Sequence, residues 1–253
     1  MSLRLHWSPD SANLPVRMAL HLLNLRFEAV RVDRASGAHG RPGYLALNPQ
    51  GLIPVLEDNG RAIFETGAIL LHLVERVCRF GSDGPPTDDP DARASALKWL
   101  FFLSNTLHAD LRVSFYVHRY VEEASEMATL RSGVARRVTA HLALIDRELE
   151  PAAPGDRGLL ASPGVLDLYL GALVRWAQIY PVGAPVIEAA ALPARLRALL
   201  EHLETWDAVR RAAAEEAIPG DRPFTAPRRP ALPEAEITGS RGSPHRTGAP
   251  KSG

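Results

Sequence analysis

The chain has 253 residues, of which 46% are hydrophobic, so it can bury a sizeable core in one large domain or in two smaller ones. Lysine plus arginine and aspartate plus glutamate both number 29. The resulting net charge of zero gives no overall attraction to nucleic acid or to an anionic membrane, and we predict neither as a partner.

The single cysteine, Cys78, excludes an intrachain disulfide framework and fits a reducing compartment. Because Cys78 lies in an apolar run, we expect a packed core thiol. The apolar stretch after Met1 is too short for a signal peptide, and no window approaches the roughly 18 apolar residues of a membrane span. We therefore predict a cytoplasmic protein.

The first eighty residues predict a mixture of strands and helices, from alternating apolar residues, apolar residues at helical spacing and turn-forming residues. Asp58-Asn59-Gly60 is a strong hairpin signal between two short apolar runs. In chain order we expect a strand at 3–7, a turn at 8–13, a helix from Leu14 or Pro15, a strand at 27–32, a loop at 34–43, strands at 53–57 and 61–64, and a helix from Thr66 to about Arg79.

The rest of the chain predicts helices almost throughout. They are expected at 91 to about 121, 127–150, 166–179 and 196–218. The predicted organisation is an α/β domain at 1–80, a Gly/Pro-rich linker at 81–90, an α-helical domain at 91–218 and a tail at 219–253. Seven Pro and five Gly predict that this tail is disordered and dispensable for folding.

Several familiar chemistries have no motif in this sequence. We find no Gly-x-Ser-x-Gly elbow, no Walker loop, no dinucleotide-binding glycine fingerprint and no Cys-x-x-Cys pair. The nine histidines show no metal-ligand spacing, so we predict no metal.

The most informative stretch reads Leu47-Asn48-Pro49-Gln50-Gly51-Leu52-Ile53-Pro54-Val55-Leu56, and it is followed by the hairpin turn and by Phe64-Glu65-Thr66-Gly67-Ala68-Ile69. In these motifs the sequence resembles the thioredoxin-like, glutathione-binding domain of glutathione S-transferases. The resemblance extends over about residues 1–218. It implies that the second domain is the family's α-helical domain, which holds a hydrophobic substrate.

The resemblance also implies how glutathione is held. Pro54 is expected to be cis, which exposes the backbone of Ile53 to pair with the cysteinyl part of glutathione. Glu65 and Thr66 lie at a strand-to-helix turn and are expected to hold the charged γ-glutamyl end. For Thr66 the alternative is a purely structural helix N-cap.

The helix around residues 99–108 looks most like bacterial, beta-like members, whose matching histidine faces the cleft and assists the thiol; here it is His108. Those members carry a cysteine in the first strand-to-helix turn, where this chain has Ala12. A mixed disulfide with glutathione at that position is therefore impossible. Ser11 and Asn13 remain as hydrogen-bond donors to the thiol, with helix capping as the alternative for both.

Three further residues are placed by the same resemblance. Residues 159–170 resemble the family's capping segment, with Gly164 in place of the usual Ser or Thr, and Asp167 is assigned to folding. Tyr116 and Trp176 are possible lining residues of the hydrophobic site, with core packing as the alternative.

The hypothesis is a glutathione transferase that binds reduced glutathione as co-substrate, stabilises its thiolate and conjugates it to a hydrophobic electrophile. Its candidate residues are, for catalysis, Ser11, Asn13 and His108, and, for glutathione binding, Ile53, Pro54, Glu65 and Thr66. The alternative is a non-catalytic glutathione-binding or protein-interaction member of the same fold, which the missing cysteine favours. The resemblance also implies a two-fold homodimer.

Overall fold

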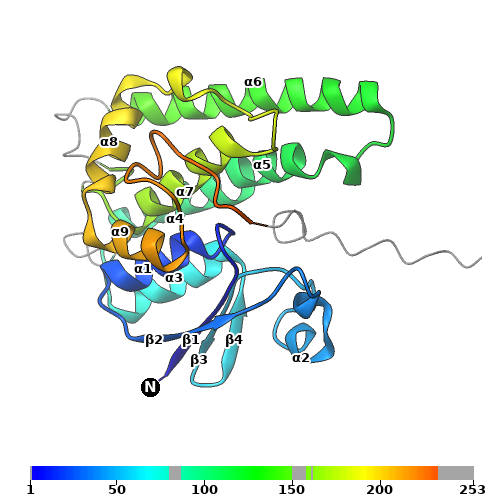
Figure 1. The fold of residues 1–253 in the computed structure, drawn as a ribbon. Coiled ribbons are helices and arrows are strands. Elements are labelled where there is room, and N and C mark those ends of the chain that lie inside the picture. The colour runs from blue at the N-terminus through cyan, green and yellow to red at the C-terminus, as the bar shows by residue number, and fades with distance from the viewer. Residues whose placement is uncertain (1, 80–86, 150–157, 161, 233–253) are drawn as a thin grey trace, which may run out of the picture.

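Figure 1 shows the chain as a computed structural model, which describes residues 2–79, 87–149, 158–160 and 162–232. A four-stranded α/β domain lies against an all-helical domain, which confirms the predicted fold class. One apolar core runs through both domains, from Leu5 in the sheet to Leu168 and Leu203 in the helices.

The sheet has the strand order β2-β1-β3-β4. Its strands are β1 (Leu3–Trp7), β2 (Phe27–Arg31), β3 (Val55–Asp58) and β4 (Arg61–Phe64). β1 is parallel to β2 and antiparallel to β3, and β3 and β4 form the predicted hairpin. Both turn residues, Asn59 and Gly60, have positive φ angles, as a two-residue hairpin turn requires.

Helices cover both faces of this sheet. α1 (Leu14–Leu22) and α3 (Thr66–Arg76) lie between the sheet and the helical domain (Figure 1). α2 (Pro42–Leu45) follows a short 3-10 turn at Ala38–Gly40 in the predicted loop, and its Tyr44 packs with Val32 and Val55 in a second, smaller apolar cluster.

The helical domain is built around α7 (Val165–Ile179), whose residues are buried as far as Ala177. The other helices are α4 (Pro90–Phe101), α5 (His108–Phe115), α6 (Ala124–Glu148), α8 (Ala194–Glu204) and α9 (Asp207–Glu215), with 3-10 turns at Val117–Arg119 and Ala189–Ala191. α1 packs directly on α7 and α9, so the turn before α1 lies at the boundary between the domains.

Two of the predicted helices are interrupted. The helix expected from 91 contains a π-helical turn at Phe102–Leu107, between α4 and α5. The helix expected at 196–218 is divided into α8 and α9, because Trp206 has extended backbone angles (φ −74°, ψ 137°) and packs partly buried on the core.

Asp167 holds the start of α7, as predicted. Its carboxylate accepts hydrogen bonds from the backbone N–H groups of Gly164 (2.7 Å) and Leu159 (2.8 Å). Burial raises the pKa of Asp167 to about 6.

Residues 219–232, which we predicted to begin a disordered tail, pack against the helical domain instead. The Phe224 side chain is fully buried and lies against Gly171 of α7, where it stands 3.0 Å from the position that a Cβ would occupy. Glu204 accepts the backbone N–H groups of Phe224 and Thr225, both at 2.8 Å. The buried Phe224 ring and two hydrogen-bonded backbone N–H groups therefore order this Pro-rich segment. Residues 233–253 lie outside the described residues.

Two further expectations concern the end of the first domain. Cys78 is exposed and not packed in the core, because α3 ends at Arg76 and Cys78 follows it in a turn with φ 56°. The predicted linker at 81–90 lies outside the described residues as far as 86, so the division at 80 and 91 stays a prediction. Along the described ranges we find no helix long and apolar enough to span a membrane.

Candidate functional site

A cavity of about 670 Å³ lies between the two domains. Most of the predicted site residues line it, namely Ser11, Ile53, Pro54, Glu65, Thr66 and His108, and so do Tyr116 and Trp176. Asn13 does not line it. The cavity thus brings together residues from the start, the middle and the end of the chain.

The loop before β3 forms one side of the cavity. The Ile53–Pro54 peptide bond is cis, as the resemblance implies. The hydroxyl of Tyr44 and the side-chain amide of Asn48 both donate to the carbonyl of Leu52 at 2.8 Å. These two bonds fix the loop at the residue that precedes Ile53. Among the hydrogen bonds of the described residues, none involves the backbone of Ile53.

Glu65 and Thr66 stand at the start of α3, and the N-cap alternative for Thr66 is wrong. Glu65, not Thr66, is the N-cap residue, with an unusual backbone for a non-glycine residue (φ 72°, ψ 119°). Such a conformation costs of order 1–3 kcal/mol and is found most often at functional sites. The Thr66 hydroxyl donates to the carbonyl of Ala12 at 3.0 Å, so this side chain ties α3 to the first turn. The first N–H groups of α3 have no partner within the helix.

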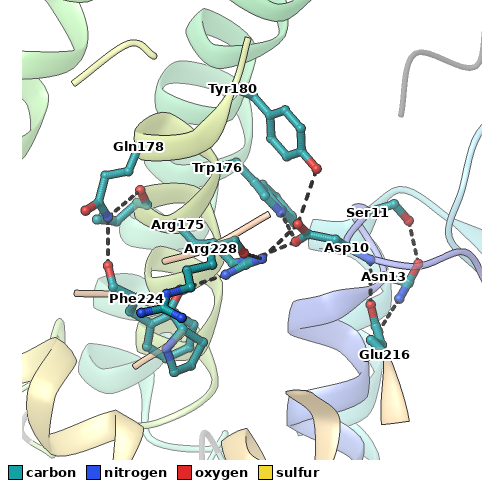
Figure 2. Close-up of polar contacts among 12 residues, drawn as sticks. Asp10, Ser11, Asn13, Arg175, Trp176, Gln178, Tyr180, Glu216, Phe224 and Arg228 are labelled. Carbon is teal, nitrogen blue, oxygen red and sulfur yellow. Dashed lines mark hydrogen bonds and ion pairs between the residues drawn. The ribbon is translucent and has the colours of Figure 1, made fainter. Parts of the chain in front are cut away.

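The first turn separates the roles of Ser11 and Asn13 (Figure 2). The Asn13 side chain caps no helix. Its Oδ1 accepts from the backbone N–H of Ser8 (3.0 Å) and from Ser11, and its Nδ2 donates to Glu216 (2.6 Å). The Ser11 hydroxyl has two acceptors within reach, the Ser8 carbonyl (3.0 Å) and Asn13 Oδ1 (2.5 Å). Ser11 lines the cavity, and its hydroxyl is the donor that can turn towards a ligand.

Asp10, beside Ser11, forms a buried ion pair with Arg175 of α7 (Figure 2). The two side chains are fully buried and meet in a double contact, Nε to Oδ1 at 2.8 Å and Nη2 to Oδ2 at 2.9 Å. Trp176 Nε1 also donates to Asp10, at 3.0 Å. Sequence reasoning missed this ion pair because 165 positions separate its two residues. The feature that could have indicated a buried charge was Arg175, an arginine within a mainly apolar stretch of α7.

Glu216, just after α9, fixes the same turn from the helical domain. It accepts the backbone N–H of Asp10 (2.9 Å), the Asn13 amide and Arg17 Nε (2.9 Å). Burial raises the pKa of Glu216 to about 8, although the charge of Arg17 opposes this rise. The first turn is therefore held from two sides by groups of the second domain.

His108 begins α5 directly after the π-helical turn and faces the cavity. Its Nδ1 lies 2.7 Å from the Tyr169 hydroxyl, and the Trp176 ring lies beside it. Burial and, to a smaller extent, the charge of Arg112 lower the pKa of His108 to about 4. The imidazole is thus neutral at neutral pH and offers the cavity a polar group without a charge. Nowhere in the described ranges do three metal-binding side chains come together.

Comparison with known proteins points to one family. The sequence profile of the glutathione S-transferase N-terminal domain matches residues 13–76. A glutathione S-transferase of Silene vulgaris is 43% identical over 74 residues, which are 29% of this chain and only 34% of that protein. A maleylacetoacetate isomerase of Rhizobium meliloti is 29% identical over 83% of this chain and 94% of its own length.

The fold is shared with solved structures as well. A sphingomonad glutathione S-transferase in complex with glutathione superimposes with a TM-score of 0.68 at 28% identity, covering 85% of this chain and all of that one.

Proposed function

Because the chain belongs to the glutathione S-transferase family, we propose that it binds glutathione in the cavity between its domains and conjugates it to an electrophile. The observation that carries the proposal is the joint placement of Ile53, Glu65, Thr66 and Ser11 around one cavity. The related sphingomonad enzyme was solved with glutathione bound.

The cysteinyl part and the γ-glutamyl end of glutathione each have a matching group. The backbone of Ile53 pairs with the cysteinyl part of the ligand, and the carboxylate of Glu65 pairs with the γ-glutamyl ammonium. The first N–H groups of α3 donate to the γ-glutamyl carboxylate, since a helix N-terminus favours an anion. This arrangement places the glutathione sulfur near the first turn, beside Ser11.

The chemical step needs a thiolate. A free thiol has a pKa of about 8.5, so only a few per cent is ionised at neutral pH. The Ser11 hydroxyl donates to the sulfur and favours the anion, and the positive end of α1 acts in the same direction. His108, being neutral, contributes polarity and shape rather than charge. The thiol proton leaves to solvent, and the sulfur attacks an electrophile held against the helical domain.

A non-catalytic, glutathione-binding member of the fold is the second candidate. Ala12 stands where beta-like relatives carry their cysteine, and the Ser11 hydroxyl already has acceptors within the protein. The relative named as an isomerase also means that family likeness alone does not identify the reaction. We further propose a two-fold homodimer, for which light scattering should report twice the chain mass; a monomer would contradict it.

Calorimetric titration with glutathione, combined with a conjugation assay using 1-chloro-2,4-dinitrobenzene, tests the proposal. Glu65→Ala should weaken glutathione binding about tenfold or more, because a charge-assisted hydrogen bond is lost. Glu28→Ala is the matched control, since Glu28 is exposed on β2 and does not line the cavity. Binding without conjugation would favour the second candidate. No binding by the wild-type protein would refute both.

A further inference from the structure

The cavity has an excess of positive charge. Four arginines line it, Arg34, Arg112, Arg119 and Arg229, against two acidic residues, Asp10 and Glu65. Asp10 contributes little negative charge to a ligand, because the guanidinium of Arg175 neutralises it in a fully buried pair. The proposed role of Glu65 is to hold the ammonium group of glutathione.

Glutathione does not use up this positive charge. Bound as the thiolate, it carries two carboxylates, one thiolate and one ammonium group, so its binding adds two net negative charges. The proposed pairings match the ammonium with Glu65, the γ-glutamyl carboxylate with the N-terminus of α3, and the thiolate with Ser11 and the N-terminus of α1. Only the glycyl carboxylate then needs an arginine, so at least one of Arg112, Arg119 and Arg229 remains without a counter-charge when glutathione is bound. Within the described part of the chain, no ion pair involves Arg112, Arg119 or Arg229.

These arginines surround the part of the cavity that belongs to the helical domain. Arg112 of α5 is electrostatically close to His108. Burial raises the pKa of Tyr180, and the charge of Arg229 acts against this rise, so these two side chains are also close. The guanidinium of Arg119 lies 4.3 Å above the Tyr116 ring. The positive groups thus stand among the aromatic residues against which a second substrate would lie.

Arg229 is placed there by the C-terminal segment 219–232 and by Arg175. Arg175 Nη1 donates to the carbonyl of Pro223 at 3.1 Å. Its Nη2 donates to the carbonyl of Arg228 at 2.8 Å (Figure 2). Gln178 donates to the carbonyl of Phe224 at 2.7 Å. The same guanidinium that neutralises Asp10 therefore holds the segment, and the segment contributes Arg229 and Leu232 to the cavity wall.

We propose that the second substrate is an apolar electrophile that carries an acidic group, and that Arg229, together with Arg112, binds this group. The inference rests on the proposed function, which by itself requires only a hydrophobic electrophile. Leu232, Trp176 and Tyr180 contact the apolar part of such a substrate. Arg229 selects the charged form, since a guanidinium binds a carboxylate through paired, charge-assisted hydrogen bonds.

A matched pair of probes isolates the charge: 4-chloro-3,5-dinitrobenzoate and its methyl ester. In both, the glutathione sulfur forms a bond to the ring carbon, chloride leaves with the electron pair of the broken bond, and the thiol proton goes to solvent. Each kcat/KM is divided by the uncatalysed rate constant of the same probe, which removes the difference in intrinsic reactivity. The wild-type enzyme should prefer the carboxylate.

Arg229→Gln is the test variant, and Arg228→Gln is its control. Arg228 carries the same charge one position earlier, and its side chain does not line the cavity. Arg229→Gln should raise KM for the carboxylate about tenfold, leave kcat for the ester within about twofold and leave glutathione affinity unchanged, whereas Arg228→Gln should change none of these. An equal loss for both probes, or a wild-type preference for the ester, would overturn the proposal.

Calorimetry with glutathione and with the two preformed conjugates separates this inference from the proposed function, because it needs no turnover. Tighter binding of the carboxylate conjugate, lost in Arg229→Gln, supports the inference even in a protein that does not catalyse. If the protein binds glutathione but has equal affinity for the two conjugates, the inference is overturned while the proposed function stands. A weaker affinity of Arg229→Gln for glutathione itself means that this arginine serves the glutathione carboxylates and not a second substrate. Absence of glutathione binding refutes the proposed function.

Discussion

Ser11 and Asn13 are neighbours in the first turn, yet they have different surroundings and should respond differently to substitution. Ser11→Ala removes the donor that faces the cavity, while the backbone bond from Leu14 N–H to the Ser11 carbonyl remains. We expect a higher pKa for the thiol of bound glutathione and slower conjugation at nearly unchanged melting temperature. Ultraviolet titration of the bound thiol and a thermal melt measure both quantities.

Asn13→Ala is the informative comparison for that experiment. It removes the side-chain acceptor of the Ser8 N–H and one of the three hydrogen bonds that Glu216 accepts, and each such loss costs about 1–3 kcal/mol in a buried site. We expect a lower melting temperature in Asn13→Ala. A fall in stability for Ser11→Ala with no change in the thiol pKa would instead make Ser11 a structural residue.

His108 links pH to stability, and the sign follows from its pKa. The folded-state pKa is lowered to about 4 from the ordinary 6.5, so the unfolded chain binds the proton more readily. The contribution of His108 to the free energy of unfolding is therefore fully present above the unfolded-state pKa, and it is lost as the pH falls through about 6.5 towards 4. When the pH is lowered from about 7 to about 5, protonation of this residue alone should lower the free energy of unfolding by about 2 kcal/mol.

Urea unfolding of the wild type and of His108→Asn at the two pH values measures this contribution. Asparagine keeps a polar group near Tyr169 but does not titrate in this range, so the variant should lose less stability on acidification. An equal loss in the two proteins would mean that His108 does not titrate as the structure implies.

At the residue scale, sequence motifs identified the cavity-facing positions but not the bonds that they make. Ile53, Pro54 and Glu65 could be named because a local motif carries them. The donors and acceptors of Asn13 and Thr66 could not, because their partners, Glu216 and the Ala12 carbonyl, are set by tertiary packing.

At the scale of elements, the C-terminal segment 219–232 is a structural part of the helical domain. Truncation after Ile218 removes the buried Phe224 ring and leaves Glu204 without three of its hydrogen bonds. Replacing a buried phenylalanine by alanine typically lowers the free energy of unfolding by about 3–5 kcal/mol, so we expect this truncation to lower it by at least as much. Truncation after Leu232 keeps every one of these contacts and is the control; the two melting temperatures should differ by many degrees.

This segment shows why composition was misleading. A high content of Pro and Gly indicates disorder when too few apolar groups are present to offset the lost chain entropy. A single Phe224, seated in the space left by Gly171, is enough here because its neighbours in the chain are also hydrogen-bonded. The break between α8 and α9 was missed for a related reason: Trp206 packs on the core, and residue spacing alone does not reveal that contact.

At the scale of the whole molecule, the Asp10–Arg175 ion pair joins the two domains and supports the cavity. Asp10→Ala leaves the buried guanidinium of Arg175 without its counter-charge, which typically costs about 3–5 kcal/mol. The pair between Glu75 and Arg93, at 2.8 Å, also joins α3 to α4 but is largely exposed. Glu75→Ala should therefore cost no more than about 1 kcal/mol. Urea denaturation of the two variants tests the contrast, and similar losses would contradict it.

The central claim is that glutathione binds between the domains, with its cysteinyl part on the backbone of Ile53. The most direct measurement is a titration of the isotopically labelled protein with reduced glutathione, followed by amide NMR. The amides of Ser11, Ile53, Glu65 and Thr66 should shift along one common binding curve, while those of the distant turn at Ala189–Ala191 should stay in place. Shifts confined to other parts of the surface, or no shifts at saturating glutathione, would contradict the account.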